Sequence, residues 1–146
     1  MLFCKPLPLV AATAAGLLAA SAVIADVRAE AQPALHHVRY TVGASQDIAN
    51  AEIYYRDTQP PSWAEYSHNT YLYTPNAEAN LGPGQPWVLE AMLADPEDWA
   101  MVVVGLPGPT TAPLAEPGFV CELRVDDVVV ATDSGTKGAL CSLRSW

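Results

Sequence analysis

The sequence predicts an all-β domain, an immunoglobulin-like antiparallel β-sandwich of about seven to eight strands, after an N-terminal signal or anchor segment. Three observations support this fold class. Most of the 13 prolines lie beyond residue 31, short segments alternate apolar with polar residues, and the uninterrupted stretches lack the i, i+3, i+4, i+7 spacing of an amphipathic helix. At 146 residues the chain has room for one such domain, which we place at residues 32–146.

Residues 1–31 have the layout of a secretory signal peptide. An early lysine precedes an uncharged run over residues 6–25, and residues 29–31 read Ala-Glu-Ala, a small-residue cleavage pattern. The competing interpretation is a retained membrane anchor, because residues 7–25 nearly reach the length that crosses a bilayer. The many alanines favour cleavage, since alanine partitions weakly into lipid. We expect a secreted, periplasmic or cell-envelope protein; the alternative is an inner-membrane anchor with the domain outside, which alone would bring it to a membrane.

The first strand candidates are separated by turn residues. In the second candidate Ile53 and Tyr55 alternate with polar neighbours that include Arg56, as in a strand with one solvated face. Two prolines at 60 and 61 then force an extended turn. The fourth candidate has helix propensity, but the prolines on both sides leave it short for a helix. These candidates are residues 36–44, 50–57, 65–74 and 87–94.

The second half of the chain supplies further strand candidates around a loop. Residues 99–105 form an unbroken apolar run, which predicts a strand buried on both faces or at a sheet centre. Residues 106–118 are a loop by composition, being rich in proline and glycine. The remaining candidates are residues 119–125, 127–133 and 139–145.

Two cysteines, Cys121 and Cys141, are the only ones beyond residue 31, and we predict that they form a disulfide. Cys121 shares one strand face with Leu123 and Val125, and Cys141 alternates with polar residues in the same way, so both sulfurs face the core. A bridge over about 20 residues is worth about 3 kcal/mol and would join late, neighbouring elements. A redox pair or half of a metal site is disfavoured, because there is no C-x-x-C and no histidine at ligand spacing.

The chain resembles the periplasmic domain of the mycobacterial small membrane proteins called MmpS, over about half of the residues after position 31. The resemblance rests on Tyr-Thr-Val-Gly at 40–43, on Ala-Glu-Ile-Tyr-Tyr-Arg-Asp at 51–57, and on Cys121 and Cys141 around a hairpin at Val125-Asp126. It implies an immunoglobulin-like sandwich outside the inner membrane that assists a resistance-nodulation-division (RND) exporter of lipids or siderophores.

The sequence differs from the MmpS pattern at three places. Its N-terminal segment looks cleavable, whereas the family has a membrane-anchoring helix. The last hairpin carries Asp126-Asp127 instead of Asp-Gly, and so lacks the residue best suited to positive φ in a tight turn. Residues 96–118 stand as an apparent insertion. These differences leave open a stand-alone secreted module.

Charge and motifs limit the function classes. Acidic residues outnumber basic ones 16 to 7, for a net charge of −9, so nucleic acid and anionic lipid are poor partners. We expect His36, His37 and His68 to face solvent, and there is neither an EF-hand loop nor a G-x-S-x-G elbow. The prediction is a protein that is not an enzyme and needs no cofactor or metal.

Aromatic residues in the middle of the chain are the candidate binding residues, because aromatics with a polar tip are frequent where surfaces recognise partners. The proline-rich loop between Pro107 and Pro117 is a second candidate. The predicted function is a non-catalytic secreted or envelope-associated binding domain, an MmpS-like accessory to an RND exporter of lipids or siderophores. Its expected partner is a membrane transporter or a lipid- or siderophore-type ligand. The alternative is a stand-alone secreted module that binds a ligand or protein and has no transporter partner. The candidate binding residues are Trp63, Tyr66, Tyr71, Tyr73 and Trp87.

Overall fold

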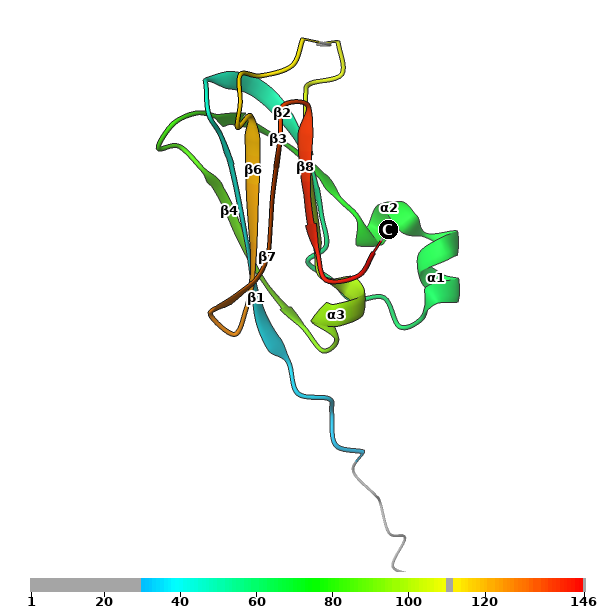
Figure 1. Ribbon diagram of the computed structural model, residues 1–146. Coiled ribbons are helices and arrows are strands. Elements are labelled where there is room, and N and C mark those ends of the chain that lie inside the picture. Colours follow the sequence, from blue (N-terminus) through cyan, green and yellow to red (C-terminus); the bar gives the residue numbers. More distant parts are fainter. Residues whose placement is uncertain (1–29, 110–111, 146) are drawn as a thin grey trace, which may run out of the picture. The chain divides into compact units, whose positions relative to one another are not determined.

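The computed structural model describes residues 30–109 and 112–145, and the compact unit that contains the strands begins at Gln32. Two four-stranded antiparallel sheets pack as a sandwich, in the orders β4-β1-β6-β7 and β3-β2-β5-β8 (Figure 1). The predicted all-β antiparallel sandwich is confirmed, at the upper end of the expected strand number. Its strands are β1 His36–Ala44, β2 Ile48–Tyr55, β3 Asn76–Leu81, β4 Trp87–Leu93, β5 Met101–Gly105, β6 Phe119–Val125, β7 Val128–Gly135 and β8 Gly138–Ser142.

Strand β1 lies inside the first sheet, and its sequence alternates between fully buried and more exposed residues. Val38, Tyr40 and Val42 are completely buried, whereas Arg39 between them is exposed. The strand pairs with β4 on one side and β6 on the other, and Val42 lies opposite Cys121 of β6. An alternating strand with neighbours on both edges and a second sheet on its apolar face buries that face entirely.

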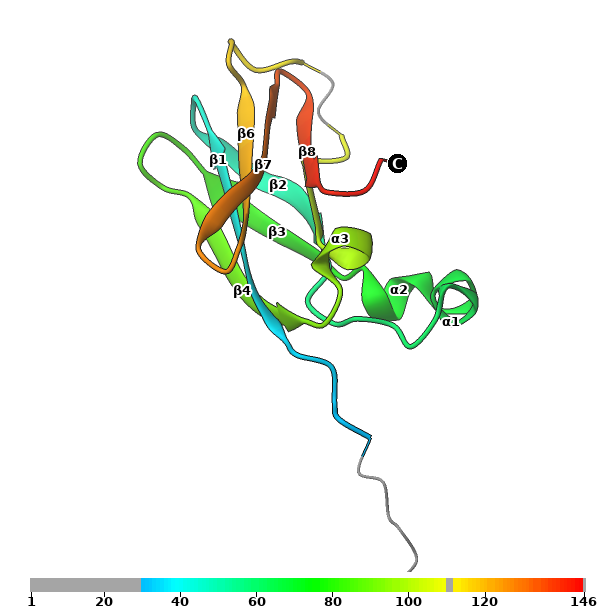
Figure 2. The same cartoon turned by 60° about the horizontal axis from the view of Figure 1, so that its bottom comes forward.

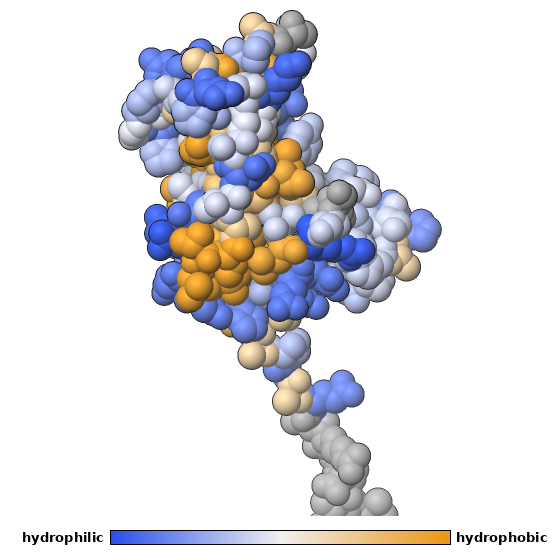
Figure 3. Space-filling view, viewed as in Figure 1, coloured by the Kyte–Doolittle hydropathy of each residue, from blue (hydrophilic) through white to orange (hydrophobic). Residues whose placement is uncertain are grey.

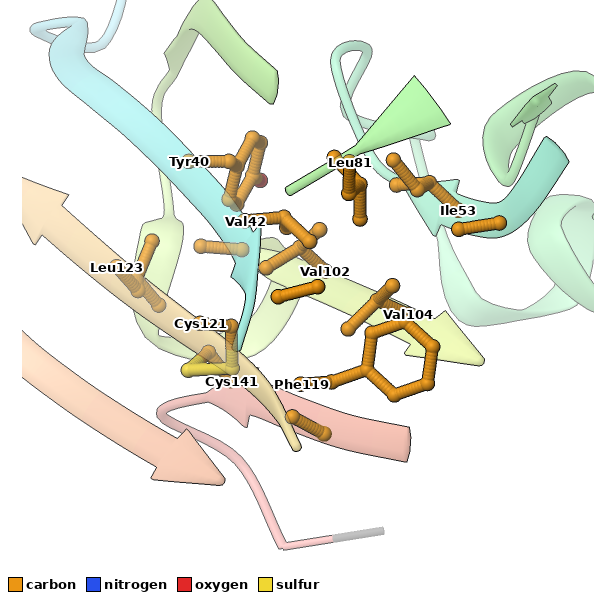
Figure 4. Close-up of a cluster of buried hydrophobic side chains, with 14 of the residues drawn as sticks. Tyr40, Val42, Ile53, Leu81, Val102, Val104, Phe119, Cys121, Leu123 and Cys141 are labelled. Carbon is orange, nitrogen blue, oxygen red and sulfur yellow. A yellow bond between two sulfur atoms is a disulfide. The ribbon is translucent and has the colours of Figure 1, made fainter. Parts of the chain in front are cut away.

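The predicted disulfide is confirmed, and it joins the two sheets. Cys121 of β6 and Cys141 of β8 have Cα atoms 6.0 Å apart, and both residues are buried. Figure 4 shows their sulfurs beside Phe119, among side chains that come from both sheets. The bridge joins two late elements, as expected, but they belong to different sheets, because β6 lies in the first sheet and β8 in the second. Leu143, expected on the same buried face, lies beyond β8 and is 38% exposed.

A buried tyrosine also connects the sheets. The hydroxyl of Tyr40 donates to the carbonyl of Arg56 at 2.7 Å and accepts from the amide of Met101 at 3.2 Å. Tyr40 belongs to the first sheet, whereas Arg56 follows β2 and Met101 begins β5 of the second. Burial raises the pKa of the Tyr40 phenol well above its ordinary value, so it stays protonated.

The hairpin between β6 and β7 forms a tight turn without glycine. Asp126 and Asp127 have φ angles of 49° and 66°, which is the left-handed conformation that a primed turn requires. Aspartate tolerates this conformation better than most residues do, so Asp-Asp replaces Asp-Gly here. The amide of Asp126 also donates to the carbonyl of His37 at 2.8 Å, which holds the hairpin against β1.

The strand predicted at residues 65–74 is wrong. This segment forms two short helices, α1 Trp63–His68 and α2 Thr70–Tyr73, beside the sandwich (Figure 2). Ser62 caps α1, since its side chain accepts from the amide of Glu65. Local hydrogen bonds and aromatic packing outweigh the strand propensity of the tyrosines. Strand β3, Asn76–Leu81, was not anticipated, because its small and polar residues have low strand propensity.

Residues 96–118 are not an insertion into the fold. They begin with the helical turn α3, Pro96–Trp99, and continue into β5, which lies between β2 and β8 in the second sheet. The central, apolar strand predicted at residues 99–105 is therefore confirmed over Met101–Gly105, whereas Trp99 belongs to α3. In the loop that follows, the described residues contain no helix or strand, but Leu114 is buried and its amide donates to the carbonyl of Thr136. None of the helices within residues 30–109 and 112–145 is long and apolar enough to cross a membrane.

Candidate binding surfaces

An aromatic cluster packs helix α1 against the helical turn α3. The ring of Trp63 on α1 stacks on that of Trp99 on α3, with centroids 4.0 Å apart, and Tyr66 meets both rings edge-on at 5.8 and 5.6 Å. The guanidinium of Arg144 lies 3.9 Å from the Trp63 ring centroid. This aromatic cluster, Trp63, Tyr66 and Trp99, packs the elements together, as offset and edge-to-face rings do in protein cores.

Arg56 is the charged residue buried beneath the aromatic cluster. It is only 1% exposed, although the sequence predicted it on the solvated face of a strand; β2 ends at Tyr55, one residue earlier. Its Nη2 donates to the hydroxyl of Tyr66 at 2.7 Å, and its guanidinium carbon lies 4.5 Å from the ring centroid of that tyrosine. Hydrogen bonds and a cation–π contact offset the cost of burying this charge. The sequence carried no signal for this role.

The five predicted binding residues do not share one surface. Trp63 and Tyr66 meet in the aromatic cluster, where both are half-buried. Tyr71 is 73% exposed on α2, next to the exposed Leu72, and Tyr73 is half-buried at the end of that helix. Trp87 begins β4 and packs against Tyr55 at a centroid distance of 5.3 Å. Binding by these residues stays a prediction, and Tyr71 is the most accessible of them.

A more continuous apolar surface lies at the start of β7. Val128, Val129 and Val130, here called the valine edge, are 62%, 45% and 36% exposed. β7 is the last strand of its sheet, so one side of its backbone faces away from β6. Figure 3 shows apolar surface gathered where β7 begins in Figure 1. The sequence predicted a strand here, but an unbroken apolar run is typical of a buried strand, so it gave no signal for the exposure of these valines.

A pocket of about 320 Å³ adjoins the valine edge. Val125, Val130 and Leu143 contribute apolar surface to this edge pocket, together with Ala94 and Pro96. Its acidic residues are Asp95, Glu97 and Asp126, and its one histidine is His36.

Asp126 of the edge pocket is held by two histidines. Its carboxylate accepts from the His37 amide at 3.0 Å and contacts the His36 ring nitrogen Nδ1 at 2.6 Å. These hydrogen bonds, that with His36 first, lower the pKa of Asp126, so this carboxylate is ionised at neutral pH. His36 and His37 were expected to face solvent; both are partly exposed, and His37 Nε2 also lies 3.6 Å from Glu90.

A second, polar groove crosses the outer face of the first sheet. It encloses about 640 Å³ and is lined mainly by small or polar residues, among them Thr41, Glu122, Thr132 and Ser134. Glu122 pairs with Arg124 on the same strand, so its carboxylate is already engaged. In the described part of the chain, no three His, Cys, Asp or Glu side chains gather closely enough to hold a metal ion.

Comparison with known proteins places the chain in a family. The model of the Rv2576c beta-sandwich domain matches residues 40–141. The chain is 37% identical over 120 residues to the uncharacterized proteins Rv2576c and MT2652 of two Mycobacterium tuberculosis strains and Mb2606c of Mycobacterium bovis, a match that covers 81% of this chain and 73% of each relative. No solved structure matches it. The chain therefore belongs to the Rv2576c beta-sandwich domain family.

Proposed function

We propose that this protein is a non-catalytic binding domain that works outside the cytoplasm, either secreted or held at the cell envelope. The observation that carries the proposal is the valine edge beside the edge pocket, where three consecutive valines of an edge strand remain exposed. Sheet edges with apolar side chains are surfaces on which other chains dock, and folded proteins normally shield them with charges or prolines.

The disulfide supports the extracytoplasmic part of this proposal. Cys121 and Cys141 are both buried and join the two sheets, so the bridge contributes to the stability of the whole sandwich. Structural disulfides of this kind persist in oxidising compartments and are rare in the cytosol. The signal-like segment at residues 1–31 supports the same location by its sequence, and residues 1–29 of it lie outside the described residues.

The absence of catalysis is part of the proposal. Each histidine already has a structural partner: His36 contacts Asp126, His37 lies near Glu90, and His68 Nδ1 contacts the carbonyl of Ala64 at 2.8 Å. A catalytic or metal-bound histidine also often has a carboxylate or carbonyl partner at its other ring nitrogen, but it stands beside further ligands or a nucleophile. In the described residues no three His, Cys, Asp or Glu side chains gather closely enough to hold a metal ion. We accordingly propose neither catalytic residues nor a cofactor.

In its most specific form, the proposal is an MmpS-like accessory of an RND exporter of lipids or siderophores. The residues shared with MmpS support it, as does an apolar N-terminal segment that, if retained, would hold the domain in the same membrane as its transporter. The alternative is a stand-alone secreted module that binds a ligand or protein without a transporter. The Ala-Glu-Ala pattern at residues 29–31 favours this alternative.

The deciding experiment measures the intact mass of the protein recovered separately from culture medium, from membranes and from the cytosol, with and without reductant. We expect it outside the cytoplasm and gaining two protons on reduction. A full-length membrane species that co-isolates with a large transporter supports the accessory role. A species in the medium that begins near Gln32 supports the stand-alone module. A reduced, full-length species in the cytosol would contradict the proposed function.

A further inference from the structure

We infer that the valine edge binds an extended, cationic and apolar segment of a partner polypeptide, which adds to the first sheet as a strand beside β7. This inference rests on the proposed function as a binding domain and names its surface and the chemistry of its partner. The argument combines the position of β7, the edge pocket and the charges around it.

The first half of β7 is an open sheet edge, whereas its second half is closed. Asp133 in the second half accepts a hydrogen bond from the amide of Leu140 on β8, at 2.9 Å. The first half, Val128–Val130, has no charged side chain of its own. The edge strands β3 and β4 each carry a glutamate, Glu78 and Glu90, and charges of this kind discourage strand addition. The fourth edge strand, β8, also has no charged side chain, but the amide of its Leu140 already donates to Asp133. The start of β7 is therefore an edge that has neither a charged side chain of its own nor the Asp133 contact that covers its second half.

The pairing of β7 with β6 directs one valine toward the edge pocket. Leu123 pairs with Ala131 and Arg124 pairs with Val129, so Val130 is the extra residue of a β-bulge. A bulge redirects the side chain of its extra residue. Val130 lines the edge pocket together with Val125 and Leu143, and the pocket's 320 Å³ leaves space for an apolar side chain of an added strand. Strand addition with side-chain pockets is a common way to bind extended peptides.

The charged residues around the edge pocket indicate which kind of partner binds there. Glu97 and Asp95 line the edge pocket and are exposed, and Asp126 is ionised beside them, while His36 is the pocket's one basic residue. With a net charge of −9 on the whole chain, this region attracts Lys or Arg side chains. A second copy of the chain would bring the same acids against each other. An anionic bilayer would be repelled for the same reason. A cationic polypeptide segment is the occupant that fits.

The test uses defined peptides and the protein as recovered from cells, from medium or from detergent-solubilised membranes. The probe is the peptide Lys-Val-Thr-Val-Thr-Val-Lys-amide with a fluorophore attached to its N-terminus, and its binding is followed by fluorescence anisotropy. One comparison peptide replaces both lysines by glutamate, and another replaces the central valine by proline, which removes a backbone donor. We expect the lysine peptide to bind at least about tenfold more tightly than either comparison peptide.

Matched substitutions locate the site on the protein. Glu97→Lys should weaken binding of the lysine peptide by about fivefold or more, whereas Glu78→Lys, the same charge change on β3, should change it less than about twofold. Val130→Thr should weaken binding, because it makes the pocket polar at nearly constant volume. Val88→Thr on β4, where the valine is similarly exposed, is its control.

Three results would overturn the inference: equal binding of the lysine and glutamate peptides, equal effects of Glu97→Lys and Glu78→Lys, or tight binding to phosphatidylcholine–phosphatidylglycerol vesicles that is lost in Val130→Thr while the peptides do not bind. These failures are distinguishable from failure of the proposed function. A disulfide-bridged protein found outside the cytoplasm that ignores all peptides keeps its function and loses this surface. A reduced cytosolic protein loses the function itself.

Discussion

Strands β1 and β7 belong to the same sheet and have nearly the same length, nine and eight residues, yet the valines of β1 are buried and those at the start of β7 are exposed. In β1, Val38 and Val42 are completely buried, between β4 and β6 and beneath the second sheet. In β7, Val128 is 62% exposed and its two successors also face solvent. Valine content therefore identifies a strand, whereas burial depends on how many neighbours surround it.

The disulfide between β6 and β8 lies in the same core as the buried valines of β1, and removing it should lower the stability of the protein more than any other change. Cys121→Ser should lower the free energy of unfolding by about 2–5 kcal/mol, because the unfolded chain regains the freedom of a closed loop. Thermal or denaturant unfolding measures the loss, and mass spectrometry should detect dimers cross-linked through Cys141. The variant with both cysteines replaced should be equally destabilised without dimers. Wild-type stability in Cys121→Ser would remove the bridge from the account.

Removing the hydroxyl of Tyr40 tests how much a buried polar contact of β1 contributes to stability. Tyr40→Phe keeps the ring but leaves the Arg56 carbonyl and the Met101 amide without this partner. We expect a loss of about 1–3 kcal/mol in the free energy of unfolding. Denaturant unfolding measures it, and Tyr71→Phe, on an exposed residue of α2, is the matched control and should change little. Equal effects of the two substitutions would show that the hydroxyl of Tyr40 does not connect the sheets.

Two identical substitutions compare the strands directly. Val38→Ala removes two buried methyl groups from β1 and should cost about 1.5 kcal/mol or somewhat more. Val129→Ala, in β7, removes the same atoms from a surface position and should change stability by less than about 0.5 kcal/mol. Denaturant unfolding of both variants gives the difference. A large effect at Val129 would mean that the valine edge is covered in the folded protein, and would break the comparison.

The smallest expected effect concerns Asp126, at the turn that leads into β7. Its pKa is lowered by the hydrogen bond with His36 and then by that with the His37 amide, so its contribution to stability is present above the ordinary aspartate pKa of about 4. That contribution is lost as the pH falls through the lowered value. Asp126→Asn, which keeps a residue suited to positive φ, should be slightly less stable than wild type at pH 6. Thermal unfolding between pH 3 and 6 should show the gap closing toward low pH.

Local patterns were sufficient for much of the fold. The alternation around Tyr40, the apolar run before Gly105 and the cysteine spacing predicted strands and a bridge that the structure contains. Each of these signals lies within a few residues of chain, or depends only on the compartment. The stretch around Tyr71 was misassigned because its fate depends on the cap at Ser62 and on stacking between Trp63 and Trp99, which lie far apart in sequence.

The candidate site was less accessible from sequence. The valines of β7 were recognised as a strand, but only the sheet order shows that this strand lies at an edge. The edge pocket brings together residues as distant as His36, Glu97 and Leu143, and a single sequence carries no signal for such proximity. Arg56 was expected at the surface because it alternates with Tyr55 in the sequence. Tertiary contacts end β2 before it and bury its side chain, and a single sequence does not reveal these contacts.

The bridge also has a mechanical consequence for the valine edge. Cys121 and Cys141 are 20 positions apart, and the whole of β7 lies between them in a covalently closed ring. When the chain is stretched from its ends, tension passes through the sulfurs and bypasses the ring. At about 3.4 Å per residue, the bridge withholds close to 70 Å of extension. A strand docked on β7 would therefore be attached to a segment that bears no tension, even while the strands outside the ring are pulled apart.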